Sequence, residues 1–190
     1  MNLPYNLFDD WFNEASKVIE EPNSMSIATV NKEGKPSLRI VLLKEFNEHG
    51  FVFYTNLESK KSLDIKENPY VAICFFWKII GKQVRIEGNV IPVSNEEADE
   101  YFATRPRLSQ VGAWASKQSR FLSSREELLQ MVNEIEKKYE GKTIPRPPHW
   151  SGWRVIPSKI EFWKEGEGRL HTRRIFDLEN NIWNEKLLFP

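Results

Sequence analysis

The sequence has very little cysteine and no segment that is both long and apolar. Its single cysteine, Cys74, excludes a disulfide within the chain, and its place in the apolar run 70–77 is typical of a buried, unreactive thiol. No run approaches the roughly 18 apolar residues of a membrane-spanning helix. Residues 1–12 lack the charged and then apolar layout of a secretory signal. We therefore expect a cytoplasmic protein without a membrane span.

Net charge is absent as well. The 27 basic residues balance the 27 acidic ones, which excludes the global basic field that binds nucleic acid. Glycine-rich nucleotide-binding motifs, metal-ligand spacings and the nucleophile elbow of serine hydrolases are also missing, so we expect no metal. The carboxylate pairs at 96–97 and 126–127 lie in charged helical runs that are typical of solvated faces. An anionic ligand must then be held by local cations, and the scarcity of acid–base groups favours a cofactor enzyme.

Aromatic residues are abundant, with seven Trp and twelve Phe in 190 residues, a length that fits one domain. Periodicity and turn residues predict an α+β fold, a small antiparallel barrel with peripheral helices, whose first three strands form two successive hairpins. Gly88 predicts a bulge or a close backbone approach. The predicted helices are 6–20, 59–68, 95–103 and 124–139, and the predicted strands are 24–30, 37–44, 51–55, 70–77, 83–93, 153–163, 169–176 and 182–188.

Two segments near the N-terminus carry clustered cations. Arg39 and Lys44 are five apart, so a strand would place them on opposite faces near its two ends, where each would hold a different anion. In 54–61 a strand is followed by a helix start with Thr55, Lys60 and Lys61, a pattern that suits a phosphate at the helix N-terminus. Strand-end charges and an ordinary capped helix start are equally compatible with these residues.

Two later segments have the same character. Tyr101, Arg105 and Ser109 recur every four residues, so on a continuous helix they would form a phosphate clamp. Arg169 and His171 alternate with Arg173, which on a strand gives one polar face for an anionic or planar ligand. A surface helix and a solvent-exposed strand face are the alternative interpretations.

Six collinear blocks resemble the pyridoxamine 5'-phosphate oxidase family. They are RIVLLK (39–44), YTNLESKK (54–61), QVRIEGNV (83–90), YFATRPRLSQVGAWASKQS (101–119), PPHWSGWRVIP (147–157) and IEFWKEGEGRLHTR (160–173). The resemblance implies a single split-barrel domain over 1–190 that forms a homodimer through about 147–190, with flavin mononucleotide (FMN) at the subunit interface. The implied reaction oxidises pyridoxamine or pyridoxine 5'-phosphate to pyridoxal 5'-phosphate, with oxygen as the electron acceptor.

The resemblance also implies the site residues. Those matched to FMN-binding positions are Arg39, Ile40, Val41, Leu42, Leu43, Lys44, Tyr54, Thr55, Lys60, Lys61, Gln83, Gln118, Ser119, Trp163 and Arg173. Among these, Gln118 and Ser119 are expected from the partner subunit. Those matched to the substrate are Lys44, Tyr101, Arg105, Ser109, Arg169 and His171, the last two being the catalytic pair that covers the pyridine ring.

Some positions depart from the family pattern. Lys60 stands where Arg is usual, Thr172 replaces an acidic residue, Leu187 replaces a C-terminal Arg, and the family's N-terminal arm is largely missing. Two other functions fit the same residues. One is a related FMN oxidase with another planar substrate, such as a phenazine precursor, and the other is a non-catalytic protein that binds FMN or pyridoxal phosphate.

Overall fold

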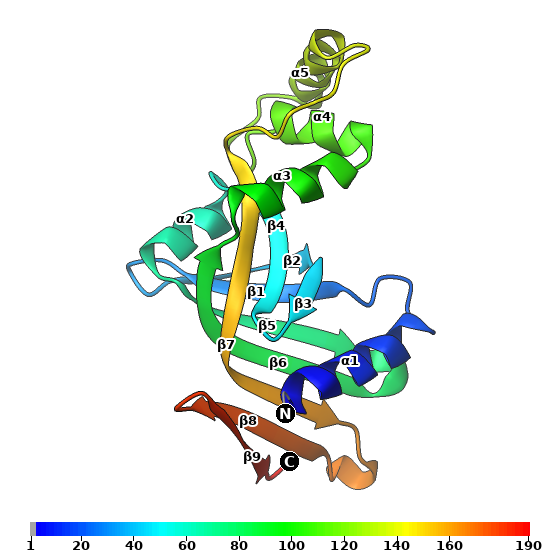
Figure 1. Cartoon of the computed structure of the whole chain (residues 1–190), viewed down its shortest axis with the longest axis vertical. Helices are drawn as coiled ribbons and strands as arrows, with labels where there is room; N and C mark the ends of the chain where they lie inside the picture. Colours follow the sequence, from blue (N-terminus) through cyan, green and yellow to red (C-terminus); the bar gives the residue numbers. More distant parts are fainter. Residues whose placement is uncertain (1–2) are drawn as a thin grey trace.

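A computed structural model describes residues 3–190 (Figure 1). The helices are α1 (Leu3–Ser16), α2 (Lys60–Glu67), α3 (Asn95–Thr104), α4 (Arg107–Ala115) and α5 (Arg125–Lys138), with short 3₁₀ turns η1 (Lys78–Ile80) and η2 (Glu167–Arg169). The strands are β1 (Ser24–Val30), β2 (Pro36–Leu42), β3 (Glu45–Asn47), β4 (Gly50–Asn56), β5 (Tyr70–Trp77), β6 (Lys82–Pro92), β7 (Trp150–Lys164), β8 (Thr172–Glu179) and β9 (Ile182–Leu188).

All strand pairs are antiparallel, and the hydrogen-bonded order is β2-β1-β5-β6-β7-β4-β3, with β8 and β9 continuing from β7. The 15-residue β7 is the central strand of the sheet. It pairs with β4 near its start, with β6 along most of its length and with β8 near its end. The sheet curls around a core, with helices at its periphery (Figure 1). This architecture confirms the predicted α+β split barrel.

The core is aromatic and joins α1 to the sheet. Side chains alternate between buried and more exposed along β1 and β5, as expected for strands with one face against a core. Phe8 of α1 is fully buried, and its ring centroid lies 5.0 Å from that of Phe51 and 5.2 Å from that of Phe75. Burial of such a ring contributes about 2–3 kcal/mol. The helix therefore closes one end of the barrel.

Gly88 lies at a bulge, as predicted. The register between β6 and β7 shifts between Glu87 and Gly88. A Cβ atom at Gly88 would lie 2.1 Å from the carbonyl oxygen of Ile156, which leaves room for glycine alone. The bulge bends β6 where it crosses β7.

The first of the two predicted hairpins is confirmed, but the second does not use the strand predicted over 37–44. β2 pairs with β1 and ends at Leu42, and a separate strand, β3, forms the hairpin with β4. The backbone N–H of Leu43 donates to the carbonyl of Asn23 (2.8 Å), and that of Lys44 donates to Val52 (2.9 Å). These bonds turn the chain away from β2, so Lys44 lies beyond the strand that was expected to contain it. The first helix likewise ends at Ser16 rather than at residue 20.

The predicted strand 169–176 begins three residues late. Arg169 ends the turn η2 with φ 66°, directly after Gly168 with φ 62°. The turn is tight, because a Cβ at Gly166 would lie 2.0 Å from the carbonyl oxygen of Leu170. The alternation of Arg169, His171 and Arg173 on one strand face is therefore incorrect.

The helices α3, α4 and α5 form a separate layer at the upper end of the molecule (Figure 1). Phe102, Val111, Ile144 and Trp150 make its buried cluster. A capping box formed by Ser94 and Glu97 fixes the start of α3. Within residues 3–190, no helix is long and apolar enough to cross a membrane.

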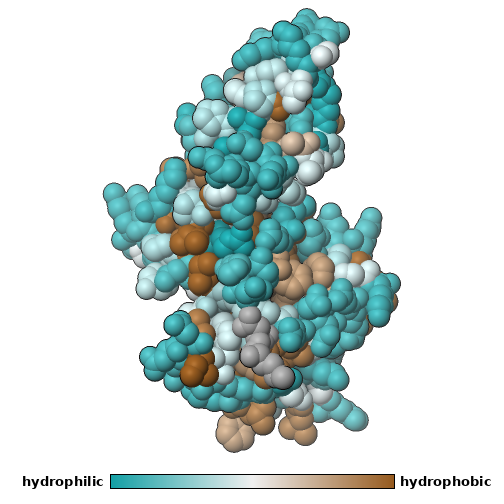
Figure 2. Space-filling view, viewed as in Figure 1, coloured by the Kyte–Doolittle hydropathy of each residue, from teal (hydrophilic) through white to brown (hydrophobic). Residues whose placement is uncertain are grey.

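The surface is mostly hydrophilic, but apolar patches appear at the lower end that holds β8 and β9 (Figure 2). The large apolar side chains exposed in this C-terminal segment are Leu170, Ile182, Leu187 and Phe189. Apolar side chains gathered in this way are typical of an interface with another protein chain.

Candidate functional site

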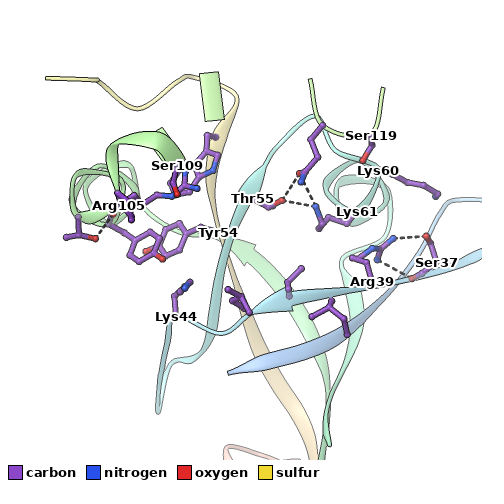
Figure 3. A pocket seen from close by; sticks show the side chains of 18 residues that line it. Ser37, Arg39, Lys44, Tyr54, Thr55, Lys60, Lys61, Arg105, Ser109 and Ser119 are labelled. Atoms are coloured by element: carbon purple, nitrogen blue, oxygen red, sulfur yellow. Dashed lines mark hydrogen bonds between the residues drawn. The ribbon is translucent and has the colours of Figure 1, made fainter. Parts of the chain in front are cut away.

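A cavity of about 830 Å³ lies between β2, β4, the start of α2 and the α3–α4 junction (Figure 3). Its size is typical of sites that bind cofactors and small molecules. It is lined by Ser37, Arg39, Ile40, Val41, Leu42, Lys44, Tyr54, Thr55, Lys60, Lys61, Tyr101, Thr104, Arg105, Pro106, Ser109, Gln118, Ser119 and Trp150.

Lys61 is the most buried cation of the cavity. Its ammonium donates to Thr55 Oγ1 (2.8 Å), Ser59 Oγ (3.1 Å) and Gln118 Oε1 (3.2 Å), all of which are uncharged. Burial and the nearby positive charge of Arg39 lower the pKa of Lys61 to about 8. The desolvated charge has hydrogen-bond partners but no counter-ion among them, which suits a site for an anion.

Arg39 and Lys60 complete this side of the cavity, and both are anchored by Asp64. Arg39 donates to Thr29 Oγ1 (2.8 Å) and Ser37 Oγ (2.7 Å). The buried Asp64 carboxylate accepts from Thr29 Oγ1 (2.7 Å) and from Lys60 Nζ (3.0 Å). Only Arg39 and Lys60 contact this carboxylate, and Lys61 has no acidic partner, so the group of three cations keeps net positive charge. The adjacent N-terminus of α2, which has no side-chain cap, adds free N–H groups.

Arg105 lies on the opposite side of the cavity, with Lys44 and Ser109 (Figure 3). One guanidinium nitrogen of Arg105 is buried and has no hydrogen-bond partner within residues 3–190. Burial lowers the pKa of this guanidinium, yet arginine stays charged at neutral pH. A buried donor without a partner is rare, and here it points to a ligand that would accept its hydrogen bond.

Tyr101, Arg105 and Ser109 all line the cavity, although no continuous helix carries them. α3 ends at Thr104, and Pro106 caps the start of α4. The predicted spacing of four therefore brings the three side chains together across a break between two helices.

Aromatic rings separate the two groups of cations. The rings of Tyr54 and Tyr101 stack with centroids 4.0 Å apart and an interplanar angle of 11°. Burial raises the pKa of Tyr54 to about 12, so its hydroxyl stays protonated at neutral pH. The cavity therefore combines two cationic ends with flat aromatic surface, an arrangement that suits planar ligands carrying phosphate groups.

Several predicted site residues lie outside this cavity. Leu43 is buried in the barrel core. Gln83, Trp163 and Arg173 are neighbours across β6, β7 and β8, and the imidazole of His171 lies 4.5 Å from the indole of Trp163. Glu161 Oε1 accepts a hydrogen bond from Arg173 Nε at 2.8 Å.

The long strand β7 separates these residues from the cavity. Trp150 at its start lines the cavity, whereas Trp163 lies near its end. At ~3.3 Å per residue, on the order of 40 Å of strand lies between them. Within one chain, Arg169, His171 and Arg173 are therefore not brought to the cavity.

Gln118 and Ser119 lie in the cavity, but in that of their own chain. The resemblance implies that a partner subunit donates them, but both line the cavity of their own chain. Gln118 Oε1 accepts hydrogen bonds from Thr55 (3.2 Å) and Lys61 (3.2 Å). The cationic side of the cavity is thus completed within one chain.

Sequence reasoning missed four lining residues, Ser37, Thr104, Pro106 and Trp150. Trp150 lies in the block 147–157, but a tryptophan two residues after a pair of prolines carries no signal that distinguishes a cavity wall from a core residue. Asp64, which anchors Lys60, was missed because its burial comes from tertiary packing.

The curled antiparallel sheet and the cavity with two cationic ends define the chain as a split-barrel protein with a site for anionic, planar ligands. A family model described as pyridoxamine 5'-phosphate oxidase matches residues 12–164. A second model, described as the pyridoxine 5'-phosphate oxidase C-terminal dimerisation region, matches residues 150–190. The chain belongs to the pyridoxamine 5'-phosphate oxidase family.

Individual relatives agree with this membership. A pyridoxine/pyridoxamine 5'-phosphate oxidase of Myxococcus xanthus is 50% identical over 98% of this chain and 91% of its own length. One of Zymomonas mobilis is 47% identical over 98% of both chains. The solved structure of PhzG from Burkholderia lata, in complex with tetrahydrophenazine-1-carboxylic acid, has a TM-score of 0.94 at 29% identity and covers 98% of this chain and 92% of that one.

A pyridoxamine 5'-phosphate oxidase-related, FMN-binding protein of Nostoc punctiforme has a TM-score of 0.80 at 15% identity, with 98% of both chains covered, and supports the fold alone. Family membership confirms the predictions of an oxidoreductase of this family and of FMN as its cofactor. The match to the dimerisation region confirms the predicted homodimer.

Proposed function

We propose that this chain oxidises pyridoxamine 5'-phosphate and pyridoxine 5'-phosphate to pyridoxal 5'-phosphate, with oxygen as the electron acceptor. The observation that carries the proposal is the pair of separate cationic groups in one cavity. A cofactor phosphate and a substrate phosphate need two such sites, and a single anion site would not explain both. The unpartnered N–H of Arg105 is the most specific part of this observation.

Lys61, Arg39 and Lys60 would hold the FMN phosphate at the N-terminus of α2. Thr55 and Gln118 fix the ammonium of Lys61 and would keep it directed at that phosphate. Bound FMN supplies a hydride acceptor that oxygen reoxidises. For the amine substrate, the overall reaction converts pyridoxamine phosphate, oxygen and water into pyridoxal phosphate, ammonia and hydrogen peroxide.

The opposite side of the cavity would hold the substrate by its phosphate. Lys44 and Arg105 supply the charge, and the hydroxyls of Tyr101 and Ser109 supply further hydrogen bonds. Binding at this end would leave the pyridine ring between the substrate phosphate site and the flavin. These residues then contribute orientation and exclusion of water, because no carboxylate or imidazole is among the described residues that line the cavity.

We further propose that the second half of each site comes from the partner subunit of the homodimer. Arg169 and His171, with Trp163 and Arg173, lie at the far end of β7 and inside the dimerisation region. The same C-terminal segment carries exposed apolar side chains, among them Leu170 and Leu187. Docking of this end against the cavity of another chain would bring the catalytic pair to the substrate and place FMN at the interface.

A direct assay tests the reaction. Purified protein loaded with FMN should consume oxygen when pyridoxamine 5'-phosphate is added, and should release pyridoxal 5'-phosphate and hydrogen peroxide in equal amounts. A flavin-loaded protein that converts neither B6 phosphate would overturn the proposal.

The likeness to PhzG favours one second candidate, an oxidase of phenazine-type substrates. Such substrates carry a carboxylate in place of a phosphate, so they would not need the full set Lys44, Tyr101, Arg105 and Ser109. Oxygen uptake measured on both classes of substrate separates the candidates. We expect turnover with the B6 phosphates and none with a dihydrophenazine carboxylic acid.

A further inference from the structure

Trp150 forms part of the aromatic wall of the cavity. Its side chain is 5% exposed, and the ring of Tyr54 stacks on it at 5.4 Å with an interplanar angle of 6°. The ring of Tyr101 is parallel to it within 5°, at 6.2 Å. The guanidinium of Arg105 lies over the indole, 4.6 Å from its centroid. One indole therefore contacts both a tyrosine and the arginine of the proposed phosphate clamp.

The way Arg105 is held differs from the way the other arginine of the cavity is held. Arg39 is fixed by hydroxyl groups and lies 4.0 Å from the carboxylate of Asp64. Arg105 rests on the faces of Trp150 and Phe102, and within residues 3–190 one of its guanidinium nitrogens is buried without a hydrogen-bond partner. An aromatic face attracts a cation without neutralising it, and the attraction is strongest when the pair is desolvated. Arg105 thus keeps its full charge for a ligand.

Trp150 is itself rigidly placed. Its backbone N–H donates to the carbonyl of Pro147 (3.0 Å), and its carbonyl accepts from Arg146 (2.8 Å). Arg146 Nε also donates to Asp99 of α3 at 2.6 Å, on the helix that carries Tyr101. Arg146 therefore links the backbone of Trp150 to the helix that carries Tyr101.

We propose that Trp150 is a positioning residue that sets substrate specificity for the phosphate group. It holds the Arg105 guanidinium and the Tyr101 ring in place before substrate arrives, and it does so without a counter-ion. This inference rests on the proposed function, because it takes Arg105 to bind the substrate phosphate. Trp150 affects recognition of the substrate phosphate and leaves the chemical step unchanged.

The test compares Trp150→Leu with Trp150→Phe, each saturated with FMN. Loss of the aromatic face should raise the KM for pyridoxamine 5'-phosphate and the inhibition constant of inorganic phosphate together by about tenfold, with kcat within about twofold of wild type. Phenylalanine keeps a cation-binding face, so W150F should stay within about threefold of wild type in both constants. Trp150→Met serves in place of W150L if the leucine variant does not fold.

Trp114 offers a matched control. It packs against the same buried cluster and has Lys138 5.3 Å above its ring, but it does not line the cavity. Trp114→Leu should lower thermal stability and leave the KM and the phosphate inhibition constant unchanged. Equal increases in W114L and W150L would mean that loosening of the helical layer explains the effect, and this would overturn the proposal.

A double-mutant cycle distinguishes positioning of Arg105 from a purely structural role of Trp150, because only positioning makes the effect of W150L depend on Arg105. In an Arg105→Ala background, most of the tenfold effect of W150L should disappear, because the cation that the indole holds is gone. A full tenfold effect in that background, or a W150F as impaired as W150L, would contradict the inference. A wild-type protein that turns over no B6 phosphate would instead overturn the proposed function, so the two failures are distinct.

Discussion

Lys61 is a cation of the cavity whose charge depends on pH just above neutrality. Burial lowers its pKa to about 8, so the ammonium loses its proton as the pH rises through that value. A bound phosphate stabilises the charged form and raises the pKa of Lys61 in the complex. Affinity for a phosphate ligand must therefore fall as pH increases, by the linkage between proton and ligand binding.

We predict that the Kd for FMN rises about tenfold between pH 7 and pH 9, since one proton is linked to binding over this range. Titration of the flavin-free protein by fluorescence quenching measures it. Lys61→Arg keeps a charge that does not titrate and should flatten the profile, whereas Lys61→Gln should bind weakly at every pH. A K61R profile as steep as that of wild type would show that another group is responsible.

The same lowered pKa makes the stability of the flavin-free protein increase with pH, whereas the affinity for FMN decreases with pH. The unfolded chain binds the Lys61 proton more tightly than the folded one, so the stability of the flavin-free protein from this residue increases between pH 8 and pH 10.5. Chemical denaturation of flavin-free wild type and K61Q across this range checks the sign. A stability that falls more steeply in wild type than in K61Q would contradict it.

Arg105 is expected to act on substrate and not on flavin. Arg105→Ala removes the guanidinium whose N–H lacks a partner, and we expect the KM for pyridoxamine 5'-phosphate to rise about 100-fold while the Kd for FMN stays the same. Arg107 is a matched control, because it donates to the carbonyls of Tyr139 (2.7 Å) and Lys142 (3.0 Å) and does not line the cavity. Steady-state kinetics in which R107A and R105A raise the KM equally would refute the assignment.

Residue patterns predicted some of this site and missed the rest for physical reasons. The spacing of Tyr101, Arg105 and Ser109 was enough to bring them together, although Pro106 breaks the helix. The alternation around Arg169 failed because the turn at Gly166 and Gly168 takes priority over strand continuation. Trp150 could not be identified from sequence, since its role depends on side chains from β4 and from α3.

At the scale of elements, strands were predictable where the apolar pattern is strong. Residues 70–77 and 182–188 form strands with the predicted bounds. The break between β2 and β3 was not predictable, because it depends on hydrogen bonds from Leu43 to Asn23 and from Lys44 to Val52 across the fold. This break matters for function, since it releases Lys44 from the strand and lets it reach the cavity beside Arg105.

The bulge at Gly88 gives a prediction for stability. Gly88→Ala would press a methyl group against the Ile156 carbonyl, and we expect a loss of about 3 kcal/mol in the free energy of unfolding. Gly112→Ala, in the middle of α4 with no atom within 4 Å of the new Cβ, should instead gain about 0.5–1 kcal/mol. Urea denaturation measures both. A G88A protein as stable as wild type would mean that β6 and β7 pair without the bulge.

At the scale of the whole molecule, one chain holds both halves of the proposed site but keeps them apart. The cavity lies beside the helical layer, and Arg169 and His171 lie at the opposite end, near β8 (Figure 1). The distance between Arg169 and His171 and the cavity of the same chain depends on the fold and cannot be inferred from the sequence. We propose that the homodimer resolves the separation, because two chains, each docking its β8 end against the cavity of the other, would form two complete sites by symmetry.

Mixing two inactive variants tests this arrangement. One chain carries Arg105→Ala and Lys61→Gln, and the other carries Arg169→Ala and His171→Ala. In a heterodimer one site has all four changes and the other has none, so unfolding and refolding the mixture should restore about a quarter of wild-type activity by statistical pairing. Recovery that stays at the level of the separate variants would show that each site is built within one chain.

The proposed reaction requires one cavity that holds a flavin and a B6 phosphate together. The most direct test is the absorption spectrum of the purified protein before and after anaerobic addition of pyridoxamine 5'-phosphate. We predict a yellow protein whose flavin band bleaches on addition and returns when oxygen is admitted. A flavin band that pyridoxamine 5'-phosphate leaves unchanged, or a protein that binds no flavin at all, would contradict the account.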